Sequence, residues 1–221
     1  LVICTDEKKG MQILERTYPT QPIAPGKPAK REHEYIRHGT RVLIASFVVP
    51  TGQVVWNLEQ TRTSTDFASH VANVVTQLPK MKHYHWVVDN LNTHWSLEVC
   101  RVVAQWCKVP CVAKDLRRGV QRRAFLSDPS HQHIFHFTPK HGSWLNQVEW
   151  WFSVLARRFL KRGDFCSAQD FATRLCEYLE IYNKKDAAGV AALYTDDGLL
   201  VPPGPITTGK QNIEKAWRAV F

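Results

Sequence analysis

Short apolar segments alternate with amphipathic segments through residues 1–185, and this alternation constrains the fold more than any other feature. The apolar segments have strand character and are LVICT, RVLIASFVVP, QVVWNL, HYHWVVDN and IFHFTP. Apolar residues recur at helical spacing over residues 64–78, 97–107, 144–162 and 167–182. Thr51-Gly52 predicts a hairpin between the second and third apolar segments. The order predicts an α/β fold, a mixed sheet flanked by helices.

Residues 186–221 differ from the rest of the chain. They predict a small-residue helix, a short strand and a second helix, with prolines between them. Some 36 residues are too few to bury a core alone, because chains below about 40 residues seldom fold unaided. We therefore predict a core domain at residues 1–185 and a short α+β extension at residues 186–221.

The charge is concentrated in the predicted core. The chain has 29 Lys+Arg and 20 Asp+Glu, a net charge of +9, and residues 186–221 contribute −1 of it. A core of charge +10 favours a polyanion partner, first of all nucleic acid. No run of about 18 apolar residues occurs, so no membrane partner is predicted, and without a leader segment we expect a cytoplasmic protein.

Three carboxylates stand where an apolar core would not place them. Asp6 and Asp89 each close a strand-like segment, and Glu149 lies on the flank of the apolar stripe of residues 144–162. An unpaired acid in such a place is costly unless it is neutral or binds a metal. Two divalent ions about 4 Å apart can activate water and neutralise phosphate charge, and Mg²⁺ prefers oxygen ligands. The pattern favours a metal site over three separate polar strand ends.

At this level of detail the sequence resembles a known family. TDEKKGMQ, VVDNLNTH and TPKHGSWLNQVEWWFSVLARRFLKRG are similar to the three acidic blocks of bacterial DDE transposases, closest to the mariner-related insertion-sequence family numbered six-thirty. The resemblance covers residues 1–183. It implies an RNase H-like fold with Asp6, Asp89 and Glu149 as catalytic ligands of two Mg²⁺ ions, for which Mn²⁺ can substitute.

The second spacing between these acids is unusual for the family. The intervening lengths are 82 and 59 residues, and the second exceeds the usual one. A basic connection at residues 108–133 accounts for the excess and contains Asp128, the rival third acid. We expect its basic side chains to bind DNA phosphates, namely Lys114, Arg117, Arg118, Arg122 and Arg123.

Other polar residues flank the three acids, and two interpretations stay open for them. They either contact the metal ligands or the DNA, or they cap turns at strand ends. Alternation along a strand predicts that Glu7 points away from Asp6. The full set is Glu7, Asn90, His94, Lys140, His141 and Asn146.

The resemblance implies a transposase core that acts on element ends and a target duplex. Water would cut a DNA phosphodiester, and the freed 3′-hydroxyl would attack the target, which the family implies is a TA dinucleotide. A homodimer is compatible with this role, and the place of action would be the bacterial nucleoid. The alternatives are an inactive nucleic-acid-binding remnant or, for residues 186–221, part of a SnoaL-like isomerase or cyclase, whose first helices and GKxxIxxxW pattern they resemble.

Overall fold

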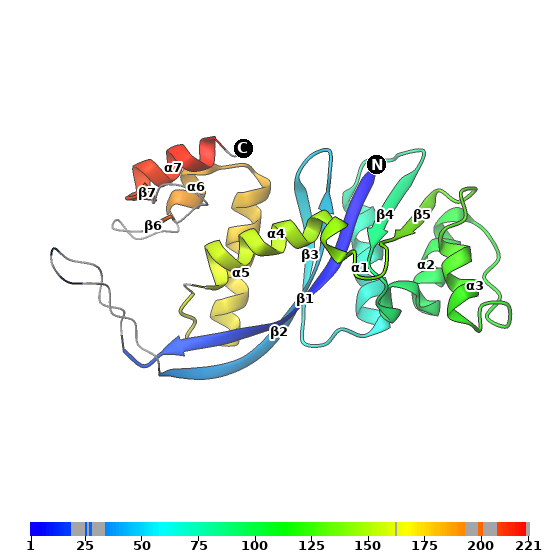
Figure 1. Ribbon diagram of the computed structural model, residues 1–221, viewed down its shortest axis with the longest axis horizontal. Helices are drawn as coiled ribbons and strands as arrows, with labels where there is room; N and C mark the ends of the chain where they lie inside the picture. The colour runs from blue at the N-terminus through cyan, green and yellow to red at the C-terminus, as the bar shows by residue number, and fades with distance from the viewer. Residues whose placement is uncertain are drawn as a thin grey trace. The chain divides into compact units, whose positions relative to one another are not determined.

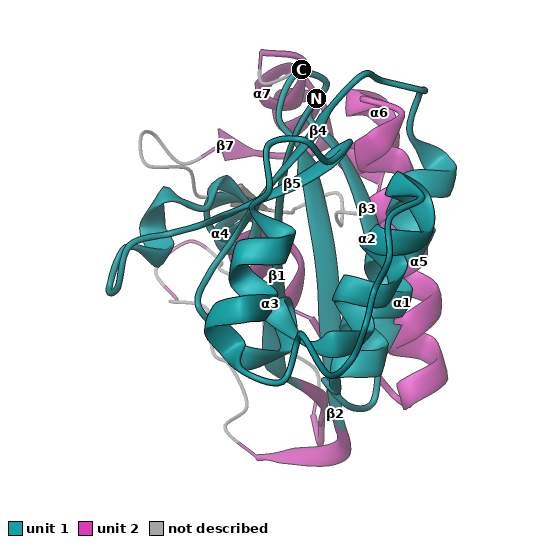
Figure 2. Ribbon diagram, turned by 90° about the vertical axis from the view of Figure 1, so that its right-hand side faces the viewer, with its two compact units in different colours: residues 1–11, 40–154 teal, residues 12–39, 155–221 magenta. Residues whose placement is uncertain are grey.

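The structure is a computed structural model that describes residues 1–18, 25, 27, 34–161, 163–192, 199–200 and 207–219. Most of residues 19–33 therefore lie outside the described residues. Contacts divide the chain into two compact units (Figure 2). Unit 1 comprises Leu1–Met11 and Thr40–Val154, and unit 2 comprises Gln12–Gly39 and Leu155–Phe221.

A mixed five-stranded sheet forms the framework, as predicted, with strand order β3-β2-β1-β4-β5 (Figure 1). Strands β1 and β4 pair in parallel, as do β4 and β5, whereas β2 and β3 are antiparallel. The turn at Gly52, with φ of 69°, confirms the predicted hairpin. The strands are β1 (Val2–Arg16), β2 (Tyr35–Val48), β3 (Gln53–Glu59), β4 (Tyr84–Val88) and β5 (His133–Phe137).

Strand β1 is longer than the sequence suggested. We expected it to close at Asp6, but Met11 and Ile13 continue the alternating burial, and the strand runs on to Arg16. Asp6 therefore lies within a strand, and the chain is held in strand conformation both before and after it. Asp89, by contrast, follows the last residue of β4, as predicted.

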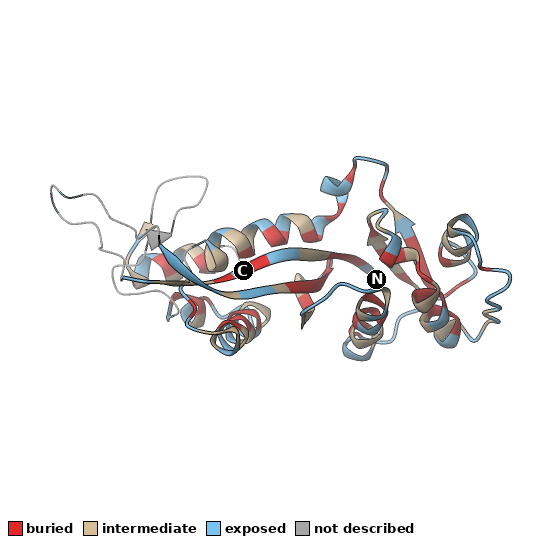
Figure 3. Ribbon diagram, turned by 90° about the horizontal axis from the view of Figure 1, so that it is seen from below, coloured by how far each residue is buried: buried red, intermediate tan, exposed pale blue. Residues whose placement is uncertain are grey.

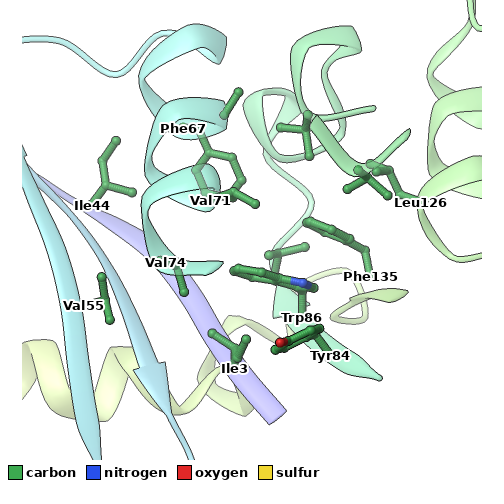
Figure 4. Packing of buried hydrophobic residues seen from close by; sticks show 14 of the residues in the cluster. Ile3, Ile44, Val55, Phe67, Val71, Val74, Tyr84, Trp86, Leu126 and Phe135 are labelled. Atoms are coloured by element: carbon green, nitrogen blue, oxygen red, sulfur yellow. The ribbon is translucent and has the colours of Figure 1, made fainter. Parts of the chain in front are cut away.

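Three helices belong to unit 1 from end to end, and their apolar faces form its core with the sheet (Figures 3 and 4). They are α1 (Ser64–Gln77), α2 (Leu97–Cys107) and α3 (Gly119–Leu126). Thr63 and Asp66 form a capping box that starts α1, and Ser96 caps α2. Trp86, Phe135 and Phe67 are fully buried in this core. Burial of each such side chain contributes about 1.5–3 kcal/mol.

The helix predicted over residues 144–162 is divided into three parts. A 3-10 turn, η2 (Ser143–Leu145), precedes α4 (Gln147–Leu155), and a π-helical turn, η3 (Ala156–Leu160), follows it. Asn146 interrupts the helix because its backbone is extended and its side chain bonds to β1. Leu145 is consequently 45% exposed and is not part of the apolar stripe. Among the described residues, no helix is long and apolar enough to cross a bilayer.

Besides η3, unit 2 contains further α-helices and a two-stranded antiparallel sheet. They are α5 (Ala168–Asn183), α6 (Ala187–Ala192), α7 (Lys210–Arg218), β6 (Leu199–Leu200) and β7 (Thr207–Thr208). Helix α6 packs against α5 and α7, and Val190, Ile213 and Trp217 are buried. The apolar faces of the tail are therefore covered within unit 2. The domain boundary at residue 185 stays a prediction.

Candidate active site

The carboxylate of Asp6 is buried at the centre of the candidate site. Asp6 is 5% exposed, and its Oδ1 accepts a hydrogen bond from the Glu7 amide at 2.8 Å. The pKa of Asp6 is raised to about 7, mainly because the carboxyl group is buried; the charge of His94 lowers this pKa, and the charge of Asp89 raises it. A buried carboxyl group of this kind gains most from a cation that favours its ionised form.

Asp89 and Asp6 come from two strands that pair in parallel. Ile3 is paired with Trp86 and Cys4 with Val87, and Asp6 and Asp89 each follow two residues after the last of these pairs, at the same end of the two strands. The Leu91 amide donates to Asp89 Oδ1 at 2.8 Å. Burial alone would raise the pKa of Asp89, but hydrogen bonds from His94 and the Leu91 amide lower it. Asp89 is therefore ionised near neutral pH.

His94 connects the two strands through carboxylates. It lies in η1 (Asn92–Trp95), with its Nε2 2.8 Å from Glu7 Oε2 and its Nδ1 2.8 Å from Asp89 Oδ1. Burial would lower the pKa of His94, but these two hydrogen bonds outweigh it and raise the pKa to about 10. Carboxylates only accept hydrogen bonds, so both ring nitrogens donate and the imidazole is charged.

The position of Glu7 corrects the prediction. The strand persists through Glu7, but its carboxylate does not point away from the site. One ligand atom each of Asp6, Glu7 and His94 lies within 4.8 Å of the others, the one such group of three among the described residues. Glu7 reaches the site because His94 and the Thr93 hydroxyl, at 3.2 Å, bind its two oxygens.

Asn146 anchors the start of α4 beside Asp6. Its Nδ2 donates to the Thr5 carbonyl at 2.9 Å and lies 3.5 Å from Asp6 Oδ2. Glu149 follows in the first turn of α4, where it is half-buried and its amide bonds to the Asn146 carbonyl. Glu149 is not part of the 4.8 Å group, so its role as the third ligand stays a prediction.

The rival acid Asp128 has a local structural role. Its Oδ1 accepts hydrogen bonds from the amide and hydroxyl of Ser130, at 2.8 and 2.7 Å. These bonds lower the pKa of Asp128. The arrangement is a capped turn before β5, which favours Glu149 as the third acid.

Asn90 joins the site to the basic connection. Its Nδ2 donates to the Thr138 carbonyl at 2.5 Å, and the Arg123 guanidinium donates to its Oδ1. The Arg123 guanidinium also lies 4.6 Å from the centre of the Phe137 ring. Residues 108–133 thus contain a helix that the sequence pattern did not predict, α3, and Arg123 of this helix forms a hydrogen bond with Asn90, the residue after Asp89.

The other predicted basic residues divide into exposed and packed ones. Lys114, Arg117 and Arg118 are exposed, whereas the Arg122 guanidinium stacks 5.3 Å from the Trp95 ring centre and Nη1 donates to Leu116. Lys140 and His141 are exposed in the turn after β5, where His141 adopts a φ of 63°. Of the two adjacent tryptophans of α4, Trp151 is buried and Trp150 is 60% exposed.

No sequence signal marks two sets of buried contacts in unit 1. Phe67 of α1 lies with its ring centre 4.2 Å from that of His94. In the second set, the hydroxyls of Thr5 and Ser46 are 2.7 Å apart, and Ser46 Oγ is 2.9 Å from His70 Nε2. Thr5 opens the first acidic block, but Ser46, Phe67 and His70 belong to none of the three blocks.

The residues present fit a divalent cation. Asp6 and Asp89 offer hard oxygen ligands at the same end of β1 and β4, whereas Asp89 and Glu149 both lie outside the group of three within 4.8 Å and stay predicted ligands. Asn146 Oδ1, on a side chain that contacts Asp6, is buried and has no hydrogen-bond partner in the described part of the chain. A buried oxygen of this kind needs a donor, a water molecule or a cation.

Comparison with known proteins bears on the family and the fold. A family described as DDE superfamily endonuclease matches residues 2–172. The Mos1 mariner paired end complex with Mn has a TM-score of 0.54 and 13% identity, over 99% of this chain and 55% of that chain. The Mos1 strand transfer complex has a TM-score of 0.49 and 13% identity, over 98% and 52%.

This chain therefore spans about half the length of the Mos1 chains it matches. The first likeness identifies the fold as the RNase H-like α/β fold, a mixed sheet flanked by helices, as predicted. No curated protein matches the sequence.

Proposed function

Because the chain belongs to the DDE superfamily endonucleases, we propose that it is the catalytic core of a DNA transposase. The proposed reaction has two steps. Water attacks a phosphodiester of the element end and releases a 3′-hydroxyl, which then attacks a phosphodiester of the target duplex. The observation that carries the proposal is the parallel pairing of β1 and β4, which brings Asp6, buried in β1, and Asp89, directly after β4, to the same end of the two strands.

Asp6, Asp89 and Glu149 would hold the metal ions. When bound, two Mg²⁺ or Mn²⁺ ions supply an activated water and neutralise charge on the phosphate oxygens. The Mos1 complex of the same fold was determined with Mn, which supports a divalent cation here. Asn146 fixes the start of α4 relative to Asp6, so that Glu149 is presented from a rigid element.

The DNA partner is supported by the charge of the chain and by the place of α3. The exposed side chains of Lys114, Arg117 and Arg118 lie just before and at the start of the helix whose Arg123 bonds to Asn90. Phosphate contacts there would position a duplex beside Asp89 without reading its sequence. Element ends, a target duplex and action at the bacterial nucleoid follow from this role.

The finer classification also rests on sequence resemblance. The three acidic blocks support the mariner-related insertion-sequence family six-thirty and, through it, a TA target. The GKxxIxxxW pattern of α7 supports a SnoaL-like origin for residues 186–221. Burial of Val190, Ile213 and Trp217 within unit 2 favours a packing role for this extension over a separate ligand pocket.

Plasmid nicking tests the proposed function. The parent chain should nick supercoiled DNA with Mg²⁺ or Mn²⁺, and Asp6→Asn, Asp89→Asn and Glu149→Gln should each lower the rate by at least about 100-fold, as expected for removal of a group essential to the transition state. Filter binding should show that each variant still binds duplex DNA.

Asp128→Asn is the matched control, because it removes an acid from a capped turn and should keep the parental rate. Nicking at the parental rate by Glu149→Gln would remove Glu149 from the site. DNA binding by the parent without any metal-dependent nicking would instead favour the inactive remnant.

A further inference from the structure

We propose that His94 is a positioning residue that orients Asp89 for metal binding, with Glu7 as its anchor rather than as a metal ligand. This inference rests on the proposed function, because it concerns the same site. It decides between two sets of side chains, since Asp6, Glu7 and His94 are also close enough together to hold an ion.

Both ring nitrogens of His94 are occupied. Nε2 lies 2.8 Å from Glu7 Oε2, and Nδ1 lies 2.8 Å from Asp89 Oδ1. A histidine binds a metal through the lone pair of a ring nitrogen. Each ring nitrogen of His94 points at a carboxylate oxygen, so neither is directed at a position that a metal could occupy. To become a metal ligand, His94 would have to break one of these two hydrogen bonds. The broken bond would be a buried one, because the side chain of His94 is 0% exposed.

The carboxylates of Glu7 and Asp89 differ in how many of their oxygens accept hydrogen bonds. Glu7 Oε2 is bound by His94 and Glu7 Oε1 by the Thr93 hydroxyl at 3.2 Å, so both of its oxygens have donors. In Asp89, the ring of His94 and the Leu91 amide both bind Oδ1. Among the described residues no hydrogen bond ends on Asp89 Oδ2, and this oxygen is the one left to face an ion.

The connection joins the elements that carry the site. Glu7 follows Asp6 in β1, and Asp89 follows β4. By binding both Glu7 and Asp89, His94 connects the segments of the two strands that carry the acids. Phe67 of α1 fixes the ring, with the two ring centres 4.2 Å apart. Side chains that orient metal ligands in this way typically change metal affinity 10- to 100-fold when they are replaced.

Mn²⁺ binding to the full chain, measured by electron paramagnetic resonance of the free ion, tests the proposal without DNA or turnover. His94→Gln should weaken Mn²⁺ binding about 10- to 100-fold. His70→Gln is the matched control, because His70 is also fully buried and has two hydrogen-bond partners, Ser46 and Asn57, neither of which is a carboxylate. It should retain parental Mn²⁺ affinity.

A double-variant cycle separates the anchor from a ligand. If Glu7 acts through His94, Glu7→Gln combined with His94→Gln should weaken Mn²⁺ binding no more than the stronger single variant does. Losses that multiply would show that Glu7 binds the ion independently and would overturn the assignment. If His94→Gln does not fold, Glu7→Gln alone decides: its loss should stay within about 100-fold, whereas a loss as complete as that of Asp6→Asn would make Glu7 a ligand.

Failure of this inference differs from failure of the proposed function. Parental Mn²⁺ affinity in a folded His94→Gln variant, together with lost binding in Asp6→Asn, would overturn the positioning role only. If the parent itself does not bind Mn²⁺, or if Asp6→Asn binds it equally well, the metal site is wrong and both proposals are rejected.

Discussion

His70 should make the stability of the protein depend on pH, and the size of the effect follows from its burial. Its ring is fully buried, with hydrogen bonds of 2.9 Å to Ser46 Oγ and 2.8 Å to Asn57 Oδ1. Burial lowers the pKa of His70 to about 3, whereas the unfolded chain takes up this proton near pH 6.5. The contribution of the neutral His70 ring to the free energy of unfolding is therefore fully present above pH 6.5. It is lost as the pH falls from 6.5 towards 3.

Within that window each pH unit costs about 1.4 kcal/mol of unfolding free energy. Between pH 7 and pH 5 the loss from this group is about 2 kcal/mol, because only the unfolded chain becomes protonated. Other groups contribute too: burial lowers the pKa of His133 to about 4, and Asp6, with its raised pKa, acts in the opposite direction. Their effects are shared by parent and variant, so the difference isolates His70.

The assay is urea unfolding of the parent and of His70→Gln, followed by tryptophan fluorescence at pH 7 and pH 5. The variant should be less stable at pH 7, because buried hydrogen bonds are removed, but should lose about 2 kcal/mol less than the parent on acidification. His141→Gln, at an exposed histidine, should keep the parental pH dependence. Equal pH dependence in His70→Gln and the parent would refute the buried neutral ring.

Two further outcomes concern DNA affinity and the tail. Replacement of Lys114, Arg117 and Arg118 by Ala should weaken duplex binding, as measured by fluorescence anisotropy. The slope of log affinity against log salt should become less steep by up to about 0.9 for each phosphate that is no longer neutralised. An unchanged slope would exclude these side chains from the interface. Trp217→Ala should destabilise unit 2 by about 3–5 kcal/mol, because Trp217 is 1% exposed and the Arg158 guanidinium lies 4.4 Å from its ring centre. Thermal unfolding measures this, and a loss below about 1 kcal/mol would mean that α7 contributes little to packing.

The sequence predicted those parts of the fold that depend on local pattern. Apolar runs and helical spacing were sufficient for the hairpin at Gly52, for α2 and for the mixed sheet. They wrongly ended the first strand at Asp6. The exposed residues Lys9 and Gly10 interrupt the apolar pattern, so the continuation of β1 to the buried Met11 and Ile13 was not predicted. A short basic helix such as α3 has few buried residues, so its apolar periodicity is weak.

The candidate site was predictable only as a set of residues, not as a geometry. Asp6 and Asp89 were proposed as ligands because each was expected to close a strand; this expectation was right for Asp89 and wrong for Asp6, and their role as metal ligands stays a prediction. The orientation of Glu7 was wrong, because the rule of alternating strand faces does not include the pull of His94, which lies 87 positions away. Hydrogen bonds that join such distant residues depend on the packed fold and leave no local pattern.

The long sequence separation within the site also has a consequence for protein synthesis. The hydrogen bond from Asn146 to Thr5 spans 141 positions, so the start of α4 cannot be anchored until that length of chain has been made. At roughly 5–20 residues per second, translation of this stretch takes about 7–30 s. The exposed cations Lys114, Arg117 and Arg118 are translated before Asn146. In the proposed role, a growing chain would therefore acquire its attraction to DNA before its active site is complete, and a ribosome near the chromosome would bring the chain to DNA before it can cut.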